Sequence, residues 1–290
     1  MRIFVAGATG AVGRLLVPLL LKAGHEVTGA SRTAEGTELV RCMGASAVRA
    51  DVLDADAVRR AVADAAPDAV IHQLTDLAGA DGRANIRLRR EGTRNLVDAA
   101  RAAGVRRIVA QSVAWAYAPG GTPADESVPL DDSPEAPRAS MVGGIRALEE
   151  TVAELGTAVV LRYGILYGPG TWYAPGGAVA AALRGEPAAF LGGIEANDAV
   201  SSFVHVADAA SAAVAALDWP SGPVNVVDDE PARGREWLPV LAGALGVPAP
   251  EPVPGGGEPW ERGALNSRAR ELGWTPEYPT WREGFAGQGI

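Results

Sequence analysis

The 290-residue sequence predicts an α/β protein with a doubly wound parallel sheet and a smaller lobe formed by its later segments. Three observations lead to this fold class. Short apolar runs alternate with stretches of helical periodicity up to Arg162. A glycine-rich turn follows the first apolar run and opens the first helix. Beyond Arg162 the composition shifts towards Gly, Pro and Trp, which is typical of loops and short elements.

The elements follow in a regular order. The predicted strands cover residues 3–6, 25–30, 46–49, 69–72, 107–111 and 157–162. The predicted helices between them lie near residues 12–22, 34–42, 54–64, 85–103 and 139–155. The later segments predict a loop over 163–177, a helix over 178–184, a sheet-like piece over 201–206, a helix over 207–217 and a strand over 223–227. Strands joined through helices run parallel, so we expect helices on both faces of the sheet.

The glycine-rich turn indicates a nucleotide site. Its candidate cofactor-binding residues are Gly7, Thr9, Gly10, Ala11, Val12 and Gly13. Glycines at this spacing let the backbone turn tightly and let a pyrophosphate approach the N-terminus of the helix. The turn follows a strand and opens a helix, which is the context that this motif requires. The alternative interpretation is a glycine-rich turn without a ligand.

The end of the second predicted strand indicates which dinucleotide binds. Ser31 and Arg32 stand where an NAD-specific site usually carries an acidic residue for the ribose hydroxyls. A guanidinium can pair with a 2'-phosphate, so the sequence favours NADP(H) over NAD(H), although Arg32 could also be a solvated surface residue. Ligands in such sheets lie beyond the carboxyl ends of the strands. Further cofactor contacts are therefore expected from Asp51, Val52, Leu74, Thr75, Gln111, Tyr163, Gly164 and Ile165.

Composition limits the partners. The net charge of −9 argues against nucleic acid or an anionic membrane as the main partner. Cys42 is the only cysteine, which excludes an intramolecular disulfide, and the three histidines lie too far apart in the sequence to suggest a metal site. The apolar segment 15–21 is too short to span a bilayer. We expect a cytoplasmic protein that binds small molecules.

Four motifs together resemble the extended short-chain dehydrogenase/reductases, a family that includes nucleotide-sugar epimerases and dehydratases. They lie at residues 7–13, 163–170, 203–208 and 224–228, in the order expected for the family. The resemblance implies a Rossmann-type NADP-binding domain over 1–164 and 201–228, and a small substrate-binding lobe over 165–200 and 229–290. A homodimer through helices 85–103 and 139–155 would also be ordinary for such a protein.

The chain departs from the family at its proton-transfer residues. The family uses a Tyr-x-x-x-Lys helix and a Ser or Thr at the end of the preceding strand. Met141 stands at the tyrosine position, Ile145 at the lysine position and Val113 at the serine position, while Arg89 replaces a frequent asparagine. A positioned acid contributes about 10²- to 10⁴-fold to a carbonyl reduction, and neither methionine nor isoleucine can donate a proton.

Three other proton sources are open. Another side chain could donate the proton; the candidates are Ser112, Tyr117, Tyr163 and Tyr173, with Ser112 and Tyr117 preferred. Ordered water could also donate it. Alternatively, a substrate phenol beside the carbonyl could stabilise the developing alkoxide. Apolar Met141 and Ile145 suit the last case, because they pack against a flat aromatic surface. The candidate substrate-binding residues are Val113, Trp115, Met141, Ile145, Trp172 and Tyr173.

This combination resembles the ketoreductases of actinomycete aromatic-polyketide pathways. It implies NADPH-dependent reduction of a ketone on a polycyclic, angucyclinone-like polyketide in antibiotic biosynthesis. One alternative is a redox sensor that binds NADP(H) without chemistry. Another is a nucleotide-sugar epimerase or dehydratase, which the missing tyrosine and lysine disfavour because a sugar hydroxyl needs a base.

Overall fold

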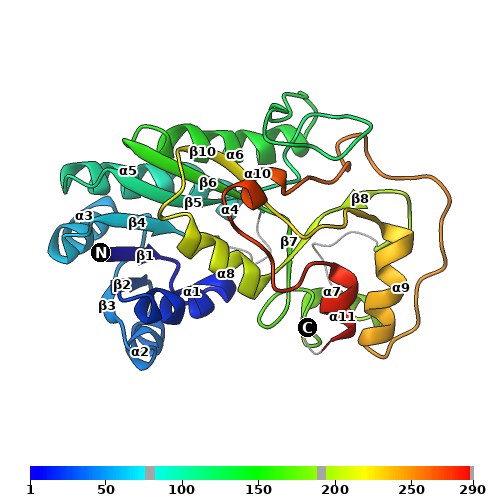
Figure 1. Ribbon diagram of the computed structural model, residues 1–290, viewed down its shortest axis with the longest axis horizontal. Helices are drawn as coiled ribbons and strands as arrows, with labels where there is room; N and C mark the ends of the chain where they lie inside the picture. Colours follow the sequence, from blue (N-terminus) through cyan, green and yellow to red (C-terminus); the bar gives the residue numbers. More distant parts are fainter. Residues whose placement is uncertain (76–81, 188–193, 288–290) are drawn as a thin grey trace. The chain divides into compact units, whose positions relative to one another are not determined.

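The computed structural model describes residues 1–75, 82–187 and 194–287 (Figure 1). The chain forms two compact units. Unit 1 comprises Met1–Ser112, Asp132–Leu161 and Ala210–Pro223, and unit 2 comprises Val113–Asp131, Arg162–Ala209 and Val224–Ile290. These units reflect compactness alone, so the division into a cofactor domain and a substrate lobe stays a prediction.

A seven-stranded sheet has the order β10-β6-β5-β4-β1-β2-β3. Its strands are β1 (Arg2–Ala6), β2 (Glu26–Ser31), β3 (Ser46–Arg49), β4 (Ala69–His72), β5 (Arg107–Val113), β6 (Thr157–Tyr163) and β10 (Gly222–Val226). The pairs β1–β2, β2–β3, β1–β4 and β4–β5 are parallel. The predicted α/β fold with a parallel sheet is confirmed, and β5 extends two residues beyond its predicted end at residue 111.

The strand order reverses between β1 and β4. From β1 the chain continues outward to β2 and β3, whereas β4 starts a second series towards β5 and β6. A reversal of this kind opens a crevice beyond the carboxyl ends of the two central strands, where α/β sheets bind ligands. The Gln73 amide donates a hydrogen bond to the carbonyl of Ala6 at 2.8 Å, so the segments that follow β1 and β4 lie side by side.

Helices cover both faces of the sheet in unit 1. These are α1 (Ala11–Lys22), α2 (Ala34–Cys42), α3 (Ala55–Ala65), α5 (Thr93–Ala102) and α6 (Arg138–Val152). Val62 of α3, Val97 of α5 and Leu148 of α6 belong to one buried core with Val70 of β4 and Ile108 of β5. Figure 1 shows α3 and α5 on one side of the strands, and α1 and α2 on the other.

The predicted helix 85–103 is interrupted, which corrects the expectation of one continuous element. It consists of α4 (Gly82–Arg87), the π-helical turn η1 (Leu88–Gly92) and α5. Gly92 packs tightly, because a Cβ at this position would lie 2.8 Å from a methyl carbon of Val52. The wider turn buries Leu88, Arg89 and Gly92 together. Turns of this type are frequent at functional sites.

Unit 2 contains short elements around an aromatic core. They are β7 (Ile165–Tyr167), α7 (Ala178–Leu183), β8 (Val200–Ser201), β9 (Phe203–His205), β11 (Ala232–Arg233), α9 (Gly234–Ala244), α10 (Ser267–Glu271) and α11 (Trp281–Ala286). Helix α8 (Val206–Ala215) begins in the unit 2 sequence range and continues into that of unit 1. Strand β7 corrects the predicted loop 163–177, because it pairs in parallel with β9. No helix in the described ranges combines the length and apolarity needed to cross a bilayer.

Candidate functional site

The glycine turn of unit 1 leaves no room for a side chain at Gly7 or Gly13. Gly7 has a φ of +94°, and a Cβ on it would lie 2.5 Å from the carbonyl oxygen of Gln73. A Cβ on Gly13 would lie 2.2 Å from the carbonyl oxygen of Gly7. The Gly10 amide closes the turn by donating to that same Gly7 oxygen at 3.2 Å. Helix α1 therefore starts directly against the end of β1.

The N-terminus of α1 is suited to an anionic group. Gly10 is its cap residue and supplies no side-chain hydrogen bond, and the first turn contains no acidic residue. The helix dipole and the first-turn amides, including those of Ala11 and Val12, therefore favour negative charge. Arg14 reinforces the turn by donating from Nε to the Thr9 carbonyl at 2.8 Å. These residues fit the pyrophosphate of a dinucleotide.

A second cationic residue lies beside Arg32. Arg49 ends β3 and is the register partner of Ser31 at the end of β2. Its Nε donates to the Arg32 carbonyl oxygen at 3.3 Å. The sequence reasoning missed Arg49, although its position at the end of a predicted strand was available as a signal. Asp51 follows, and its carboxylate accepts a hydrogen bond from the Leu53 amide at 3.0 Å.

His72 at the end of β4 is buried and neutral. Its Nδ1 accepts a hydrogen bond from the Leu74 amide at 3.2 Å, so Nε2 carries the proton and donates to Thr93 Oγ1 at 2.9 Å. Burial, helped by the nearby charge of Arg89, lowers the pKa of His72 to about 4. This pair fixes the start of α5 against β4. The predicted cofactor contacts Leu74 and Thr75 follow directly.

The two α6 residues expected at proton-transfer positions, Met141 and Ile145, differ in exposure. Met141 is 36% exposed, whereas Ile145 is 1% exposed and belongs to the interior of unit 1. The α6 sequence contains neither tyrosine nor lysine. The only lysine of the chain, Lys22, ends α1, and all five tyrosines lie in the sequence ranges of unit 2. Unit 1 therefore offers no tyrosine hydroxyl for proton transfer.

Ser112 is paired with a carboxylate that the sequence reasoning did not assign to the site. Its hydroxyl donates to Glu149 Oε1 at 2.6 Å. Ser112 is 4% exposed, and Glu149 lies one helical turn beyond Ile145 on α6. Val113 and Gln111, its neighbours on β5, are half-buried. A hydroxyl that donates to a carboxylate is poorly placed to donate elsewhere, which disfavours Ser112 as a direct acid.

Tyr117 has a structural arrangement in unit 2. Its hydroxyl donates to Asn225 Oδ1 at 2.5 Å, and the guanidinium carbon of Arg162 lies 4.9 Å from the centre of its ring. Burial raises the pKa of Tyr117 to about 12. The expected role of Tyr117 as a proton-transfer helper is therefore disfavoured. Tyr163 is similarly occupied, because its hydroxyl donates to the Ala209 carbonyl at 3.1 Å.

The remaining unit 2 candidates divide between core and partly exposed positions. Tyr173 packs edge-on to Phe203, with ring centres 5.7 Å apart, and burial raises its pKa. Trp172 packs against the same aromatic core, whereas Trp115 is half-buried outside it. Gly164 requires its small size, because a Cβ would lie 2.7 Å from the Ser202 carbonyl oxygen. Ile165, also proposed for the cofactor, starts β7 and is half-buried.

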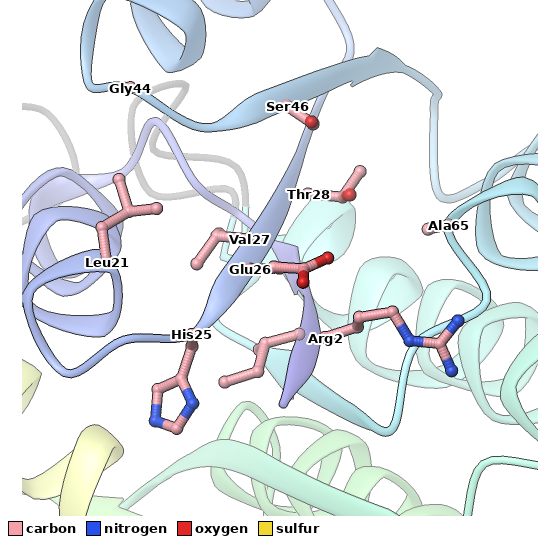
Figure 2. Close-up of a pocket in the computed structure, with 10 residues that line it drawn as sticks. Arg2, Leu21, His25, Glu26, Val27, Thr28, Gly44, Ser46 and Ala65 are labelled. Carbon is pink, nitrogen blue, oxygen red and sulfur yellow. The ribbon is translucent and has the colours of Figure 1, made fainter.

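A hollow of about 310 Å³ lies at the other edge of the sheet in unit 1 (Figure 2). Arg2, His25, Glu26 and Ser46 line it at or next to the amino ends of β1, β2 and β3. Ligands of α/β sheets bind at the carboxyl ends, so this hollow is not the expected nucleotide site. In the part of the chain that the structure describes, no group of His, Cys, Asp and Glu side chains could hold a metal ion.

Comparison with known proteins gives a consistent result. Residues 3–227 match the NAD dependent epimerase/dehydratase family. A 3-diazoavenalumate denitrifying reductase from a Streptomyces species is 45% identical over 98% of this chain and 99% of its own length. A 2-alkyl-3-oxoalkanoate reductase from Stenotrophomonas maltophilia is 35% identical over 59% of this chain and 52% of its own length.

One solved structure resembles this chain in fold over almost the whole length of both proteins. UDP-glucose 4-epimerase from Thermus thermophilus, in complex with NAD, has a TM-score of 0.75 and 28% identity, covering 99% of both chains. The family match covers the glycine turn, β1 to β10 and helix α6. The chain belongs to the NAD dependent epimerase/dehydratase family.

Proposed function

We propose that the protein is an NADPH-dependent reductase of a small aromatic compound and that it supplies no proton donor of its own. The favoured substrate is an aromatic diazo carboxylate. The observation that carries this proposal is the apolar set Met141, Ile145 and Val113, which stand where the resemblance to the short-chain dehydrogenase/reductases leads us to expect acid–base residues. A reductase with these residues needs an electrophile that can be reduced without a protein acid.

The proposed contacts with the pyrophosphate and the 2'-phosphate come from unit 1. The turn from Gly7 to Gly13 and the start of α1 would hold the pyrophosphate, because they offer backbone amides at a helix N-terminus without a side-chain cap or an acidic residue. Arg32 and Arg49 would pair with a 2'-phosphate. When bound, NADPH supplies a hydride. The residues of the chain would orient the two reactants and exclude water.

The diazo substrate is favoured by both chemistry and similarity. Reduction of a ketone creates an alkoxide that must be protonated, whereas an aromatic diazonium group is a cationic acceptor, so no alkoxide develops. Apolar side chains such as Met141 and Ile145 therefore suit it. The relative that is 45% identical is named for the denitrifying reduction of a diazo compound.

The second candidate is reduction of a ketone on a polycyclic, angucyclinone-like polyketide. A phenol beside the carbonyl would then stabilise the alkoxide within the substrate. Met141 favours this reading, because its exposed side chain offers apolar surface to a flat ring. We also propose a cytoplasmic location and a homodimer through η1, α5 and α6, whichever of the two substrates the protein reduces.

The test follows NADPH absorbance with three matched substrates. They are a 3-diazo-4-hydroxycinnamate, a polycyclic ketone with a phenol beside the carbonyl, and the same ketone with that phenol methylated. Turnover of the diazo compound with release of N₂ supports the first candidate, and turnover of the free phenol alone supports the second. Equal turnover of both ketones would require a protein or water donor and would refute the substrate-assisted mechanism of the second candidate.

Two further outcomes identify the alternatives. Tight NADPH binding without turnover of any substrate would indicate a redox sensor. Interconversion of UDP-sugars would indicate an epimerase and would contradict the apolar assignment of the site. The control in each assay is Gly243→Ala, a variant in α9 where a Cβ meets nothing within 4 Å.

A further inference from the structure

Arg89 is a charged residue with a buried side chain. It is 8% exposed, and it occupies the π-helical turn η1. Within residues 1–75, 82–187 and 194–287, no carboxylate or hydrogen-bond acceptor pairs with its guanidinium. Burial lowers the pKa of Arg89 to about 10, which still leaves it charged near neutral pH. The neighbouring ionisable side chain is His72, whose neutral ring offers no compensating charge.

Arg89 lies at the ligand-binding edge of the sheet. Thr93, the first residue of α5, bonds to His72, the last residue of β4. Arg89 comes one turn earlier on η1, which therefore continues beyond the carboxyl end of β4. Gly92 of η1 packs against Val52, which follows β3. Because the charge of Arg89 lowers the pKa of His72, the guanidinium lies near the end of β4, one of the two strands at the reversal point.

Such a charge is costly unless something binds it. Removing a guanidinium from water without a partner destabilises the folded protein, and proteins pair nearly all buried charges. A protein can keep an unpaired buried charge where a bound ligand supplies the partner. We therefore expect such a charge at the edge of the sheet where ligands bind. Arg90, its neighbour on η1, is exposed and needs no such partner.

We propose that Arg89 is a ligand-binding residue whose guanidinium pairs with an anionic oxygen bound at the carboxyl ends of β1 and β4. The oxygen belongs either to a phosphate of the dinucleotide or to the carboxylate or phenolate of the substrate. This inference rests on the proposed ligand site. It adds the requirement that the ligand bound there carries an anionic group.

The test compares Arg89→Met, Arg89→Lys and the control Arg90→Met in the full-length protein. Thermal unfolding is measured without ligand. Dissociation constants are then measured for NADPH and, separately, for 4-hydroxycinnamate as an acidic aromatic probe. Arg89→Met should unfold at the same or a higher temperature than the wild type, because it removes an unpaired buried charge.

The same variant should bind one of the two probes at least about 10-fold more weakly, as expected for loss of a charge-assisted hydrogen bond. Arg89→Lys should recover part of that loss, and Arg90→Met should bind like the wild type. The probe that is affected identifies the source of the anionic oxygen.

Binding of both probes within about 2-fold of the wild type would overturn the role of Arg89, as would a lower unfolding temperature without a change in binding. A wild-type protein that binds no NADPH would refute the proposed function, while the 4-hydroxycinnamate arm would still decide the role of Arg89. A wild type that binds neither probe would overturn both.

Discussion

Replacement of Arg32 by alanine should separate the two dinucleotides. We expect Arg32→Ala to weaken NADPH binding and to leave NADH binding unchanged, because only NADPH carries the 2'-phosphate. A hydrogen bond to a charged group contributes about 1.5–3 kcal/mol, which corresponds to roughly 10- to 150-fold in Kd. Arg32 is exposed, so solvent screening places the expected loss near the lower end, at about 10- to 30-fold.

The contribution of Arg49 should be smaller. Its Nε already donates to the Arg32 carbonyl, at a distance of 3.3 Å that indicates a weak bond. Arg49→Ala should therefore weaken NADPH binding about 3- to 10-fold. The double variant should lose less than the sum of the two free energies if both guanidinium groups share one phosphate.

The assay is a fluorescence titration of each variant with NADPH and with NADH at one fixed ionic strength. Arg41→Ala is the control, because Arg41 is exposed on α2 and pairs with Glu38. Tighter wild-type binding of NADH than of NADPH would refute the reasoning. An equal loss for both dinucleotides in Arg32→Ala would refute it as well, because the 2'-phosphate would then play no part.

Three further predictions concern the turn and two buried titratable groups. Gly13→Ala places a Cβ 2.2 Å from the Gly7 carbonyl oxygen, so calorimetric titration should detect no NADPH binding, whereas Gly243→Ala should bind normally. The pKa of His72 is lowered to about 4 from 6.5, so the unfolded state binds a proton first as pH falls. The free energy of unfolding should drop by about 3 kcal/mol from pH 6.5 to pH 4, and urea titrations of His72→Asn should show a shallower drop. Burial raises the pKa of Asp228 to about 8, so the folded state keeps a proton that the unfolded state has released. Stability should therefore fall as pH rises from about 4 to about 8, and Asp228→Asn should be stabilised more at the upper end of that window; an unchanged slope would contradict the burial argument.

Local patterns predicted the strands well. The bounds of β3 and β4 match the sequence prediction residue for residue, because turn-forming residues precede each strand, Gly44 before β3 and Pro67 and Asp68 before β4. The π-helical turn η1 could not be predicted, since it depends on the packing of Gly92 against the distant Val52. Strand β7 was missed because it forms by pairing with β9, which lies beyond a long intervening segment.

The candidate site also contains features that the sequence predicts and features that only the folded structure shows. The glycine turn between β1 and α1 and the position of Arg32 directly after β2 were predictable, because a short continuous segment encodes both; their binding roles stay predictions. The pairs Ser112–Glu149 and His72–Thr93 were not, since each joins residues that only the folded sheet brings together. Exposure was also out of reach, so nothing in the sequence distinguished buried Ile145 from exposed Met141.

The most direct test of the central claim measures single-turnover oxidation of NADPH by the preferred substrate in Ser112→Ala, Tyr117→Phe and Tyr173→Phe. If the chain donates no proton, each variant that remains folded should react within about 3-fold of the wild-type rate. A fall of about 100-fold in any one of them, with NADPH binding intact, would identify a protein acid and contradict the account.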